Sequence, residues 1–438
     1  MNLTFGFVIF IGAMIWCIIS GYTMVIALFV GLIAFAAVAF RHGFSAGELV
    51  KMGAEGLRDA VIVIEVMFII GFITAVWRSS GTITYFIYYG IKFITPGLFL
   101  LITFALCCLL SYALGTSFGV CGTAGVIFMA LARTGGVNEL LTAGVVMSGI
   151  YFGDRGSPVS SSAILVASVT GTDLLKNVKM MAKTGLVPLL ITFGIYTFLS
   201  FSNPIQQVDK SFLHTLSSEF AVSPWCLIPA LCMVVLPLMK VKVVYAMLAS
   251  IASGAAVSVF VQGMEISSLI NCLIFGYTSE GELGRILGGG GMLSMIEIVC
   301  IVALSSTYSG IFSGTSMLSG LQSALMPLMK KIGRFGTMTV TSFVFLAVFC
   351  NQTIASMMCC DMMKKPYEDS GAGREELAAD MENSVIVLAG LVPWAIACSV
   401  PLGFLQADLT ALVFAVYLYA VPLCYAVQKK VTNPFGKE

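Results

Sequence analysis

The sequence predicts an all-α polytopic membrane protein with about 10–13 transmembrane helices, and three observations predict this class. Hydrophobic residues make up 58% of the 438 residues and charged residues only 10%, whereas a soluble domain carries about 25% charged residues. Apolar runs of about 20 residues, the length that crosses a bilayer, recur along the whole chain. The longest polar stretch, Lys364 to Asn383, is too short to form a soluble domain.

The expected membrane segments follow one another with short polar connections. Apolar segments of spanning length lie at 3–20, 22–40, 60–77, 97–115, 184–202, 242–262, 291–312, 336–360, 384–404 and 407–427. Shorter apolar pieces lie near 82–94, 119–132, 140–152, 158–171, 224–239 and 313–329. The first segment has no basic stretch before it and no small-residue cleavage site, so we expect a membrane anchor rather than a signal peptide.

An internal repeat divides the chain into two similar halves. Four pairs of landmarks are each about 235 residues apart: Glu65 and Glu297, Gly81 and Gly314, Thr116 and Gln352, Pro158 and Pro393. Such repeats are typical of secondary transporters. The expected divisions are a transmembrane anchor at 1–21, a first transmembrane repeat at 22–202, a connector at 203–241, a second transmembrane repeat at 242–427 and a C-terminal tail at 428–438.

Two glycine- and serine-rich stretches interrupt the apolar sequence and predict broken helices. One is "SYALGTSFGVCGTAGVIF", and the other is "GIYFGDRGSPVSSSAILVASVTGTD". Backbone that leaves the helix inside a membrane must be buried in protein or line a wet cavity, because lipid offers no hydrogen bonds. The alternative is that these stretches are turns outside the membrane.

Composition excludes several classes of function. We find no nucleotide-binding loop, so an ion gradient or a separate subunit must supply the energy for any transport. The 13 cysteines form no Cys-x-x-Cys pair with a nearby histidine, and only two histidines exist, so we expect no metal site and no cofactor. The net charge of +1 favours no nucleic-acid partner. No nucleophile–base pair points to an enzyme.

A set of ordered motifs resembles the NhaC-type sodium/proton antiporter family, within the ion transporter superfamily. The motifs are "SSGTITYFIYYG", "LGTSFGVCGTAG", "SGIYFGDRGSPVS", "VTGTDLL", "GGGGMLSM", "CNQT" and "LVPW". The resemblance covers residues 60–405 and implies a secondary antiporter with two inverted repeats and broken helices at the membrane centre. The family pattern is broken at Ser161, Asn383 and Ala395, which removes oxygen ligands that a sodium ion would use. Restoring the acids with Ser161→Asp and Asn383→Asp is therefore expected to strengthen a sodium response.

Two glutamates lie within apolar segments where the resembled family generally has apolar residues. Glu65 and Glu297 each lie about 8–9 Å into their segments. If the halves are inverted, the two carboxylates lie about 13 Å apart along the membrane normal, a separation that suits a small organic molecule. An acid in a membrane helix usually faces a cavity, where a proton and a cationic group can compete for one negative charge. The alternative position is the membrane interface.

The other candidates for binding substrate or ions, or for coupling protons, lie at or beside the expected breaks. They are Thr116, Ser117, Asp154, Ser157, Ser160, Ser161, Asn351, Gln352, Thr353, Glu382, Asn383, Ser384 and Trp394. Arg155 is expected to form a structural ion pair with Asp154 that fixes the first break. The polar triplet from Asn351 to Thr353 either lines a cavity or only bonds neighbouring helices. Trp394 is either a stacking wall for an organic solute or a packing residue.

These features predict an ion-coupled antiporter of the inner (plasma) membrane that exchanges protons against sodium. The alternative is proton- or sodium-coupled transport of a small organic solute, an amine, amino acid or carboxylate, that uses Glu65 and Glu297. The expected partners are the lipid bilayer, protons, sodium and a small-molecule substrate, and a homodimer is left open. Three basic clusters are expected on the cytoplasmic side: Lys176, Lys179 and Lys183; Lys330, Lys331 and Arg334; Lys429 and Lys430. The side of the N-terminus is left open.

Overall fold

The computed structural model describes residues 3–93, 95–205, 216–239, 241–279, 287–315 and 322–431. Parts of the expected connector 203–241, of the shorter apolar piece near 313–329 and of the tail 428–438 lie outside these residues. Within the described ranges the chain is helical apart from turns and loops, and one isolated antiparallel bridge joins Tyr277 to Gly289. The predicted all-α class is therefore confirmed.

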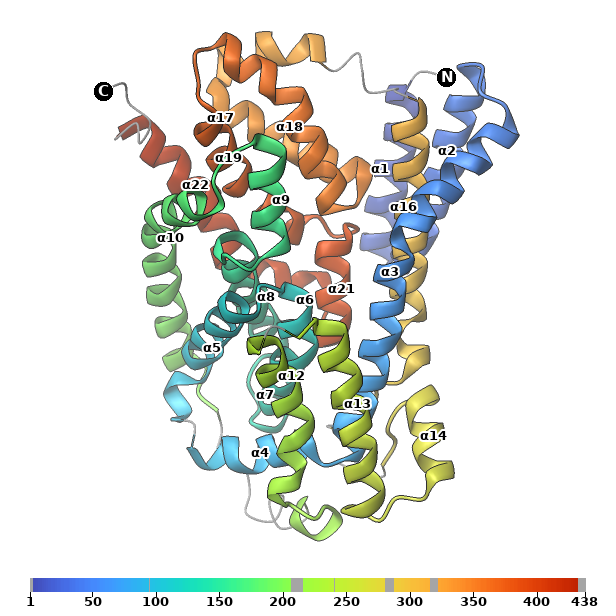
Figure 1. The fold of residues 1–438 in the computed structure, drawn as a ribbon, viewed down its shortest axis with the longest axis vertical. Helices are drawn as coiled ribbons and strands as arrows, with labels where there is room; N and C mark the ends of the chain where they lie inside the picture. Colours follow the sequence, from blue (N-terminus) through green and yellow to red (C-terminus); the bar gives the residue numbers. More distant parts are fainter. Residues whose placement is uncertain are drawn as a thin grey trace.

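Four long helices stand side by side along one flank of the molecule (Figure 1). They are α1 (Leu3–Ser20), α2 (Met24–Arg41), α3 (Ala46–Ser79) and α16 (Ile296–Thr315). Helices α3 and α16 are antiparallel and touch through glycines. A Cβ atom on Gly56 would lie 2.1 Å from the Ser306 carbonyl oxygen, and one on Gly71 would lie 2.8 Å from the Gly291 carbonyl oxygen. Only glycine permits this approach of the two backbones.

The rest of the first half consists of broken and short helices around a buried centre. They are α4 (Thr82–Phe93), η1 (Pro96–Leu98), α5 (Phe99–Leu114), α6 (Ser117–Val120), η2 (Cys121–Gly125), α7 (Val126–Thr134), α8 (Glu139–Gly156), α9 (Ser161–Thr170) and α10 (Leu174–Ser202). Segment η2 has π-helical geometry. The expected connector contains η3 (Pro224–Leu227) and α12 (Ile228–Leu238), and the expected second repeat begins with α13 (Val243–Phe260), α14 (Ile266–Phe275) and η4 (Met292–Met295).

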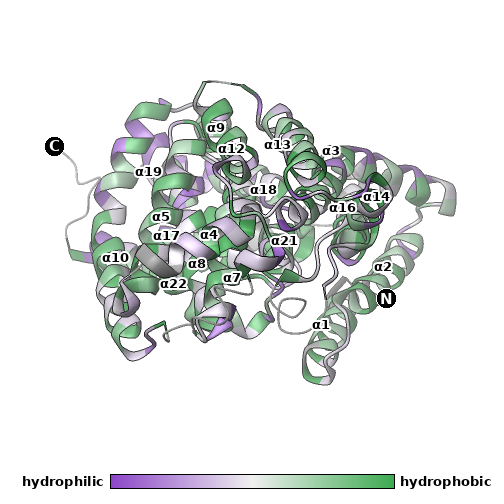
Figure 2. Cartoon of the chain, turned by 90° about the horizontal axis from the view of Figure 1, so that it is seen from below, coloured by the Kyte–Doolittle hydropathy of each residue, from purple (hydrophilic) through white to green (hydrophobic). Residues whose placement is uncertain are grey.

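The second half after α16 shows a similar alternation of long helices and breaks. Its elements are α17 (Gln322–Phe349), α18 (Gln352–Asp369), α19 (Arg374–Glu382), α20 (Val385–Leu388), η6 (Ala389–Leu391), α21 (Ile396–Leu405), η7 (Leu409–Phe414) and α22 (Val416–Val431). In Figure 1, α9 and α18 lie in the upper half, whereas α7 and α21 lie below them. Hydrophobic residues cover most faces of the helices, as Figure 2 shows, which is expected of helices that face lipid or a buried core on every side.

Apolar helices of spanning length recur along the described part of the chain. Six described helices are long and apolar enough to cross a membrane, or eight if each of two bent pairs is one span. Four further apolar helices have only 10–17 residues. Together the spanning helices, the two bent pairs and the shorter apolar helices agree with the expected polytopic membrane protein.

The breaks in the two halves have matching backbone geometry. Gly115 after α5 has φ 63° and Cys350 after α17 has φ 56°. The next residues, Thr116 and Asn351, are extended, with ψ 121° in both, and each caps the helix that follows. This match supports the predicted repeat, whereas the inverted arrangement and the domain boundaries stay predictions.

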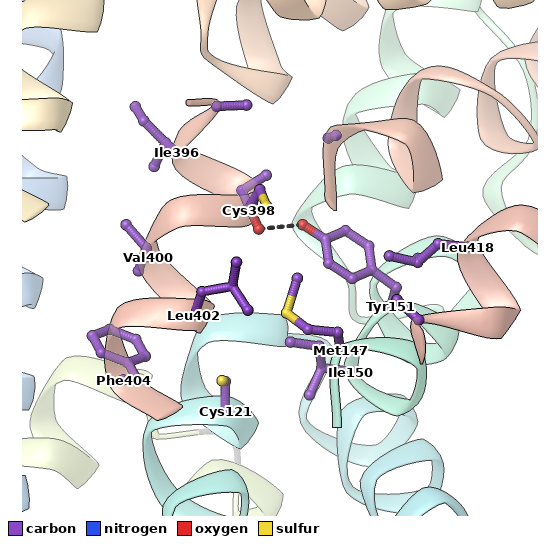
Figure 3. Close-up of a cluster of buried hydrophobic side chains, with 14 of the residues drawn as sticks. Cys121, Met147, Ile150, Tyr151, Ile396, Cys398, Val400, Leu402, Phe404 and Leu418 are labelled. Atoms are coloured by element: carbon purple, nitrogen blue, oxygen red, sulfur yellow. Dashed lines mark hydrogen bonds between the residues drawn. The ribbon is translucent and has the colours of Figure 1, made fainter. Parts of the chain in front are cut away.

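A dense apolar layer holds the central helices together. Tyr151 on α8 donates a 2.5 Å hydrogen bond to the Ala397 carbonyl oxygen on α21 (Figure 3). Around it pack Cys121, Met147, Cys398 and Leu402, which are all at most 3% exposed. The layer ties the first half to the second directly beside the breaks.

All three basic clusters lie toward one end of the molecule. They are carried by the start of α10, the part of α17 on either side of Gly333 and the end of α22, which lie in the upper half of Figure 1. The start of α1 lies at the same end. Because basic residues favour the cytoplasm, this arrangement predicts that the end is cytoplasmic and that the N-terminus lies there.

Candidate functional site

Asp154, in the last turn of α8, is the centre of a buried polar group. Its side chain is only 4% exposed. The Ser162 hydroxyl lies 3.0 Å from both carboxylate oxygens, and Gln352 Nε2 donates to Oδ2 at 3.0 Å. Ser160 Oγ donates to the Asp154 carbonyl oxygen at 2.6 Å and lies 3.5 Å from Oδ1. These contacts join side chains from α8, α9 and α18.

Two helix N-termini point toward this carboxylate. Helix α8 ends at Gly156, before Pro158, and α9 begins after Ser160, whose hydroxyl accepts from the amides of Ser162 and Ala163. Helix α18 begins after Asn351, whose side chain accepts from the amides of Thr353 and Ile354. The N-terminus of a helix carries a partial positive charge. Both termini therefore stabilise negative charge on Asp154.

Four breaks in the helices touch in pairs: the break between α5 and α6 touches the one between α8 and α9, and the break between α17 and α18 touches the one before α21. In the first half, Gly115 lies against the break between α8 and α9. A Cβ atom on Gly115 would be 2.5 Å from the Val159 carbonyl carbon and oxygen. In the second half, the amide of Ile396 donates to the Cys350 carbonyl oxygen at 2.8 Å. The Gln352–Asp154 hydrogen bond then joins the two pairs. The non-helical backbone of all four breaks therefore lies together inside the protein, where its polar groups are kept away from lipid.

Arg155 has neutral partners. Its guanidinium donates to Asn383 Oδ1 at 2.7 Å, to Thr184 Oγ1 at 2.8 Å and to the Tyr417 hydroxyl at 3.1 Å. The ion pairs of the described residues do not include the expected pair with Asp154. The two adjacent side chains on α8 therefore have separate partners. Arg155 instead ties α8 to α10, α19 and α22.

Glu382, at the end of α19, is a fully buried carboxylate. Its exposure is 0%, and neither oxygen has a hydrogen-bond partner. The charges of both Arg155 and Asp154 act on it. Asn383 next to it accepts from Arg155, while the Ser384 hydroxyl donates to the Asp380 carbonyl oxygen at 2.6 Å. Of the three predicted residues Glu382, Asn383 and Ser384, only the glutamate has no hydrogen-bond partner for its side chain within the described part of the chain.

The structure places Glu65 and Glu297 differently from the expectation. Each lies six residues from the contact between Gly71 and Gly291, so the two are level with one another, about 9 Å from that contact. The expected 13 Å stagger is wrong, because α3 begins at Ala46 and Glu65 lies near its middle. Both side chains are exposed, and Thr23 donates to Glu297. Neither shares a hydrogen bond with the Asp154 group.

The remaining predicted residues, all within the described ranges, make no hydrogen bond to Asp154; several of them cap helices or bond to backbone carbonyl oxygens nearby. Thr116 caps α6, Ser117 is buried beside it, and the Ser157 hydroxyl donates to the Tyr112 carbonyl oxygen at 2.6 Å. Ser161 and Thr353 are exposed in the first turns of α9 and α18. Trp394 donates to the Ala347 carbonyl oxygen at 2.9 Å and packs edge-on against Phe10 at 5.9 Å.

Ser162 is the site residue that the sequence prediction did not select. Three consecutive serines follow the Ser-Pro break, and the prediction included Ser160 and Ser161. Once α9 begins at Ser161, helical geometry turns Ser162 toward Asp154 and leaves Ser161 outside. The helix start at the third position after the proline is the signal that could have selected it.

The sequence of this chain matches a family model and several known transporters. A model of the Na+/H+ antiporter family matches residues 1–170 and 149–428. The chain belongs to the Na+/H+ antiporter family. As a member, it is a multi-pass transporter of the cell membrane, consistent with its apolar helices.

Relatives within the Na+/H+ antiporter family have different substrates in their names. The chain is 28% identical over 380 residues to the malate-2H(+)/Na(+)-lactate antiporter of Bacillus subtilis, covering 84% of this chain and 81% of the relative. It is 26% identical over 412 residues to the Na(+)/H(+) antiporter NhaC of the same organism, covering 91% and 90%. It is 23% identical over 382 residues to the arginine/ornithine antiporter ArcD of Halobacterium salinarum, covering 83% and 77%.

Proposed function

We propose that this member of the Na+/H+ antiporter family exchanges protons against sodium, and that both ions compete for the carboxylate of Asp154. The observation that carries the proposal is the hydrogen-bonded group of Asp154, Ser162 and Gln352 at the junction of both halves. A carboxylate that holds either a proton or a cation couples their movements, because both cannot bind at once. Because Asp154 is buried, water screens its charge little, and the carboxylate attracts a proton or a cation strongly.

The surroundings of Asp154 suit a hard cation. Sodium prefers oxygen ligands, and Asp154, Ser160 and Ser162 offer carboxylate and hydroxyl oxygens. Gln352 turns its Nε2 toward the carboxylate. Rotation of this amide by 180° would present Oε1 instead, so the same side chain can stabilise the free carboxylate or complete the oxygen shell.

Glu382 supplies a second proton-binding group in this mechanism. An ionised carboxylate without hydrogen bonds is costly in a buried place, and Glu382 has no partner for either oxygen. The charge on Asp154 acts on Glu382. Loading Asp154 with a cation or a proton therefore changes how readily Glu382 holds its own proton.

A small organic solute is the second candidate substrate. The departures at Ser161, Asn383 and Ala395 remove oxygen ligands, and two relatives are named for organic substrates. In this version Glu65 and Glu297 are the acids that bind the cationic group or the proton. Glu65 and Glu297 lie at the same level along α3 and α16, and both side chains are exposed.

The test uses purified protein in acid-loaded vesicles with a pH-sensitive dye. Sodium alone is expected to collapse the pH gradient, and Asp154→Asn is expected to abolish the response. Asp361→Asn, the same change at an exposed position of α18, is the matched control and should respond as the unchanged protein does. A response that requires an added amine, amino acid or carboxylate would reject the sodium proposal and favour the organic solute.

A further inference from the structure

A long groove lies between α17 and α22 at the end that carries the basic clusters. Its volume is about 1310 Å³. Four basic side chains line one end of it: Lys330, Arg334, Lys429 and Lys430. Farther along, its walls are apolar and include Val340, Leu391, Tyr419 and Leu423. We call this feature the α17–α22 groove.

The groove has the dimensions of one leaflet of a bilayer. On α22 the wall runs from Lys430 to Tyr419, about 15–17 Å at 1.5 Å per residue. On α17 it follows the helix from Arg334, after the interruption at Gly333, to Val340. Half of a hydrocarbon core of about 30 Å is also about 15 Å. Val340, Tyr419 and Leu423 are 40–67% exposed, so the apolar wall is open toward the place that lipid occupies.

The charge of the groove is concentrated at its basic end. Arg334 and Lys429 both pair with the buried carboxylate of Glu376, which lies behind the groove rather than in its lining. Lys330 and Lys430 are exposed at the rim. Asp369 is the single acidic residue in the lining. Lys429 also pairs with the buried carboxylate of Asp380 at 2.7 Å. An anionic group at this end therefore meets the exposed Lys330 and Lys430 first, while Arg334 and Lys429 share their charge with buried carboxylates.

The backbone of α17 also opens at this end. Gly333 has φ 76° and ψ 174° and interrupts the helix between the basic end and the apolar wall. A Cβ atom built on it would meet nothing within 4 Å. The interruption leaves open space where a bulky head group would have to sit.

We propose that the α17–α22 groove binds one anionic phospholipid of the cytoplasmic leaflet. The phosphate lies among Lys330, Arg334, Lys429 and Lys430, and the acyl chains follow the apolar wall toward Val340 and Tyr419. Anionic lipids are enriched on the cytoplasmic side, and basic pockets between membrane helices at that side recognise their head groups. The bound lipid fills the gap between α17 and α22, which both pack against the helices of the Asp154 site.

The first experiment measures lipid binding by native mass spectrometry of purified full-length protein. Phosphatidylglycerol is expected to stay bound through detergent exchange, whereas phosphatidylcholine is lost. Lys330→Gln with Lys430→Gln should weaken phosphatidylglycerol binding about tenfold or more. Lys176→Gln with Lys179→Gln, the same charge change at the same end on α10, should not. Equal loss in both double variants would overturn the location, and equal binding of the two lipids would overturn the proposal.

A second pair of variants tests the apolar wall without changing charge. Ala426 lines the groove and Val427, its exposed neighbour on α22, does not. Ala426→Trp should reduce retained lipid while Val427→Trp retains it, with thermal unfolding measured to show that both fold. Inorganic phosphate and phosphatidylglycerol are compared as stabilisers of the unchanged protein. Equal stabilisation by phosphate alone would show an anion site and overturn the lipid.

Discussion

Gln352, the first residue of α18, donates a 3.0 Å hydrogen bond to Asp154 in the last turn of α8, although the two are 198 residues apart in sequence. Asp154 belongs to the first half of the chain and Gln352 to the second. One carboxylate is thereby held by both halves, where their helix breaks meet. Any movement of one half against the other must change this contact, which makes it a natural point of coupling.

Replacing each acid by its amide distinguishes a transport site at Asp154 from one at Glu65 and Glu297. Glu65→Gln and Glu297→Gln should leave sodium-driven proton movement close to that of the unchanged protein, because both side chains are exposed and lie outside the Asp154 group. Asp154→Asn should abolish it. Proton fluxes in vesicles measure all three. The reverse pattern, with Asp154→Asn active and the glutamate variants inactive, would place the site on α3 and α16.

Loss of the Gln352 amide should weaken ion binding. Gln352→Leu removes the Oε1 that the rotated amide would present to sodium beside Asp154, so it should lower the apparent sodium affinity by about 10- to 100-fold. Thr353→Val, the next residue and exposed, is the control. The measurement is the sodium concentration that gives half-maximal flux. An unchanged value in Gln352→Leu would separate this side chain from the ion site.

Protons should compete with sodium more weakly when Glu382 cannot titrate. Glu382→Gln keeps the shape of the buried side chain and removes its ionisation, and the protein should fold because neither oxygen has a partner to lose. The ratio of protons to sodium ions moved should fall, and the apparent sodium affinity should depend less steeply on pH. Paired flux measurements at several pH values test this. The same ratio in the variant and the unchanged protein would remove Glu382 from the proton path.

The two substitutions that introduce the acids of the family pattern, Ser161→Asp and Asn383→Asp, should have different effects. Asn383 Oδ1 already accepts from Arg155 at 2.7 Å, and its Nδ2 donates to the Ala379 carbonyl oxygen at 2.7 Å. Asn383→Asp should form an ion pair with Arg155 but lose the second bond, so it should not improve the sodium response or raise thermal stability. Ser161 is exposed in the first turn of α9, beside Ser160 and Ser162. Ser161→Asp should therefore account for any gain in sodium affinity. A gain from Asn383→Asp alone would contradict this division.

The packing of α5 on α8 should depend on Gly153. A Cβ atom there would lie 2.0 Å from the Ser111 carbonyl carbon, so Gly153→Ala should destabilise the protein by about 1–3 kcal/mol or more. Gly194→Ala on α10 is the matched control, because a Cβ atom there meets nothing within 4 Å and alanine favours a helix. Thermal unfolding in detergent should show a lowered midpoint only for Gly153→Ala.

The sequence by itself determined the class of the protein and the places where its helices break. Apolar composition requires lipid around the chain, and the conformational preferences of glycine and proline end helices whatever their neighbours do. The interruptions at Gly115 and Pro158 therefore lie where the sequence predicts them. Polar residues at the breaks, among them Asp154 and Gln352, were recognisable because a polar group in a membrane segment needs a partner.

Only the tertiary structure decided which partners those polar groups have. Whether Ser161 or Ser162 reaches Asp154 depends on the residue at which α9 begins, and whether Arg155 pairs with Asp154 or Asn383 depends on how α19 packs. The level of Glu65 and Glu297 follows from the register of α3 against α16, which glycine contacts far along both helices fix. Such distances are set by the packing of segments that are remote in sequence, and local preferences carry no information about them.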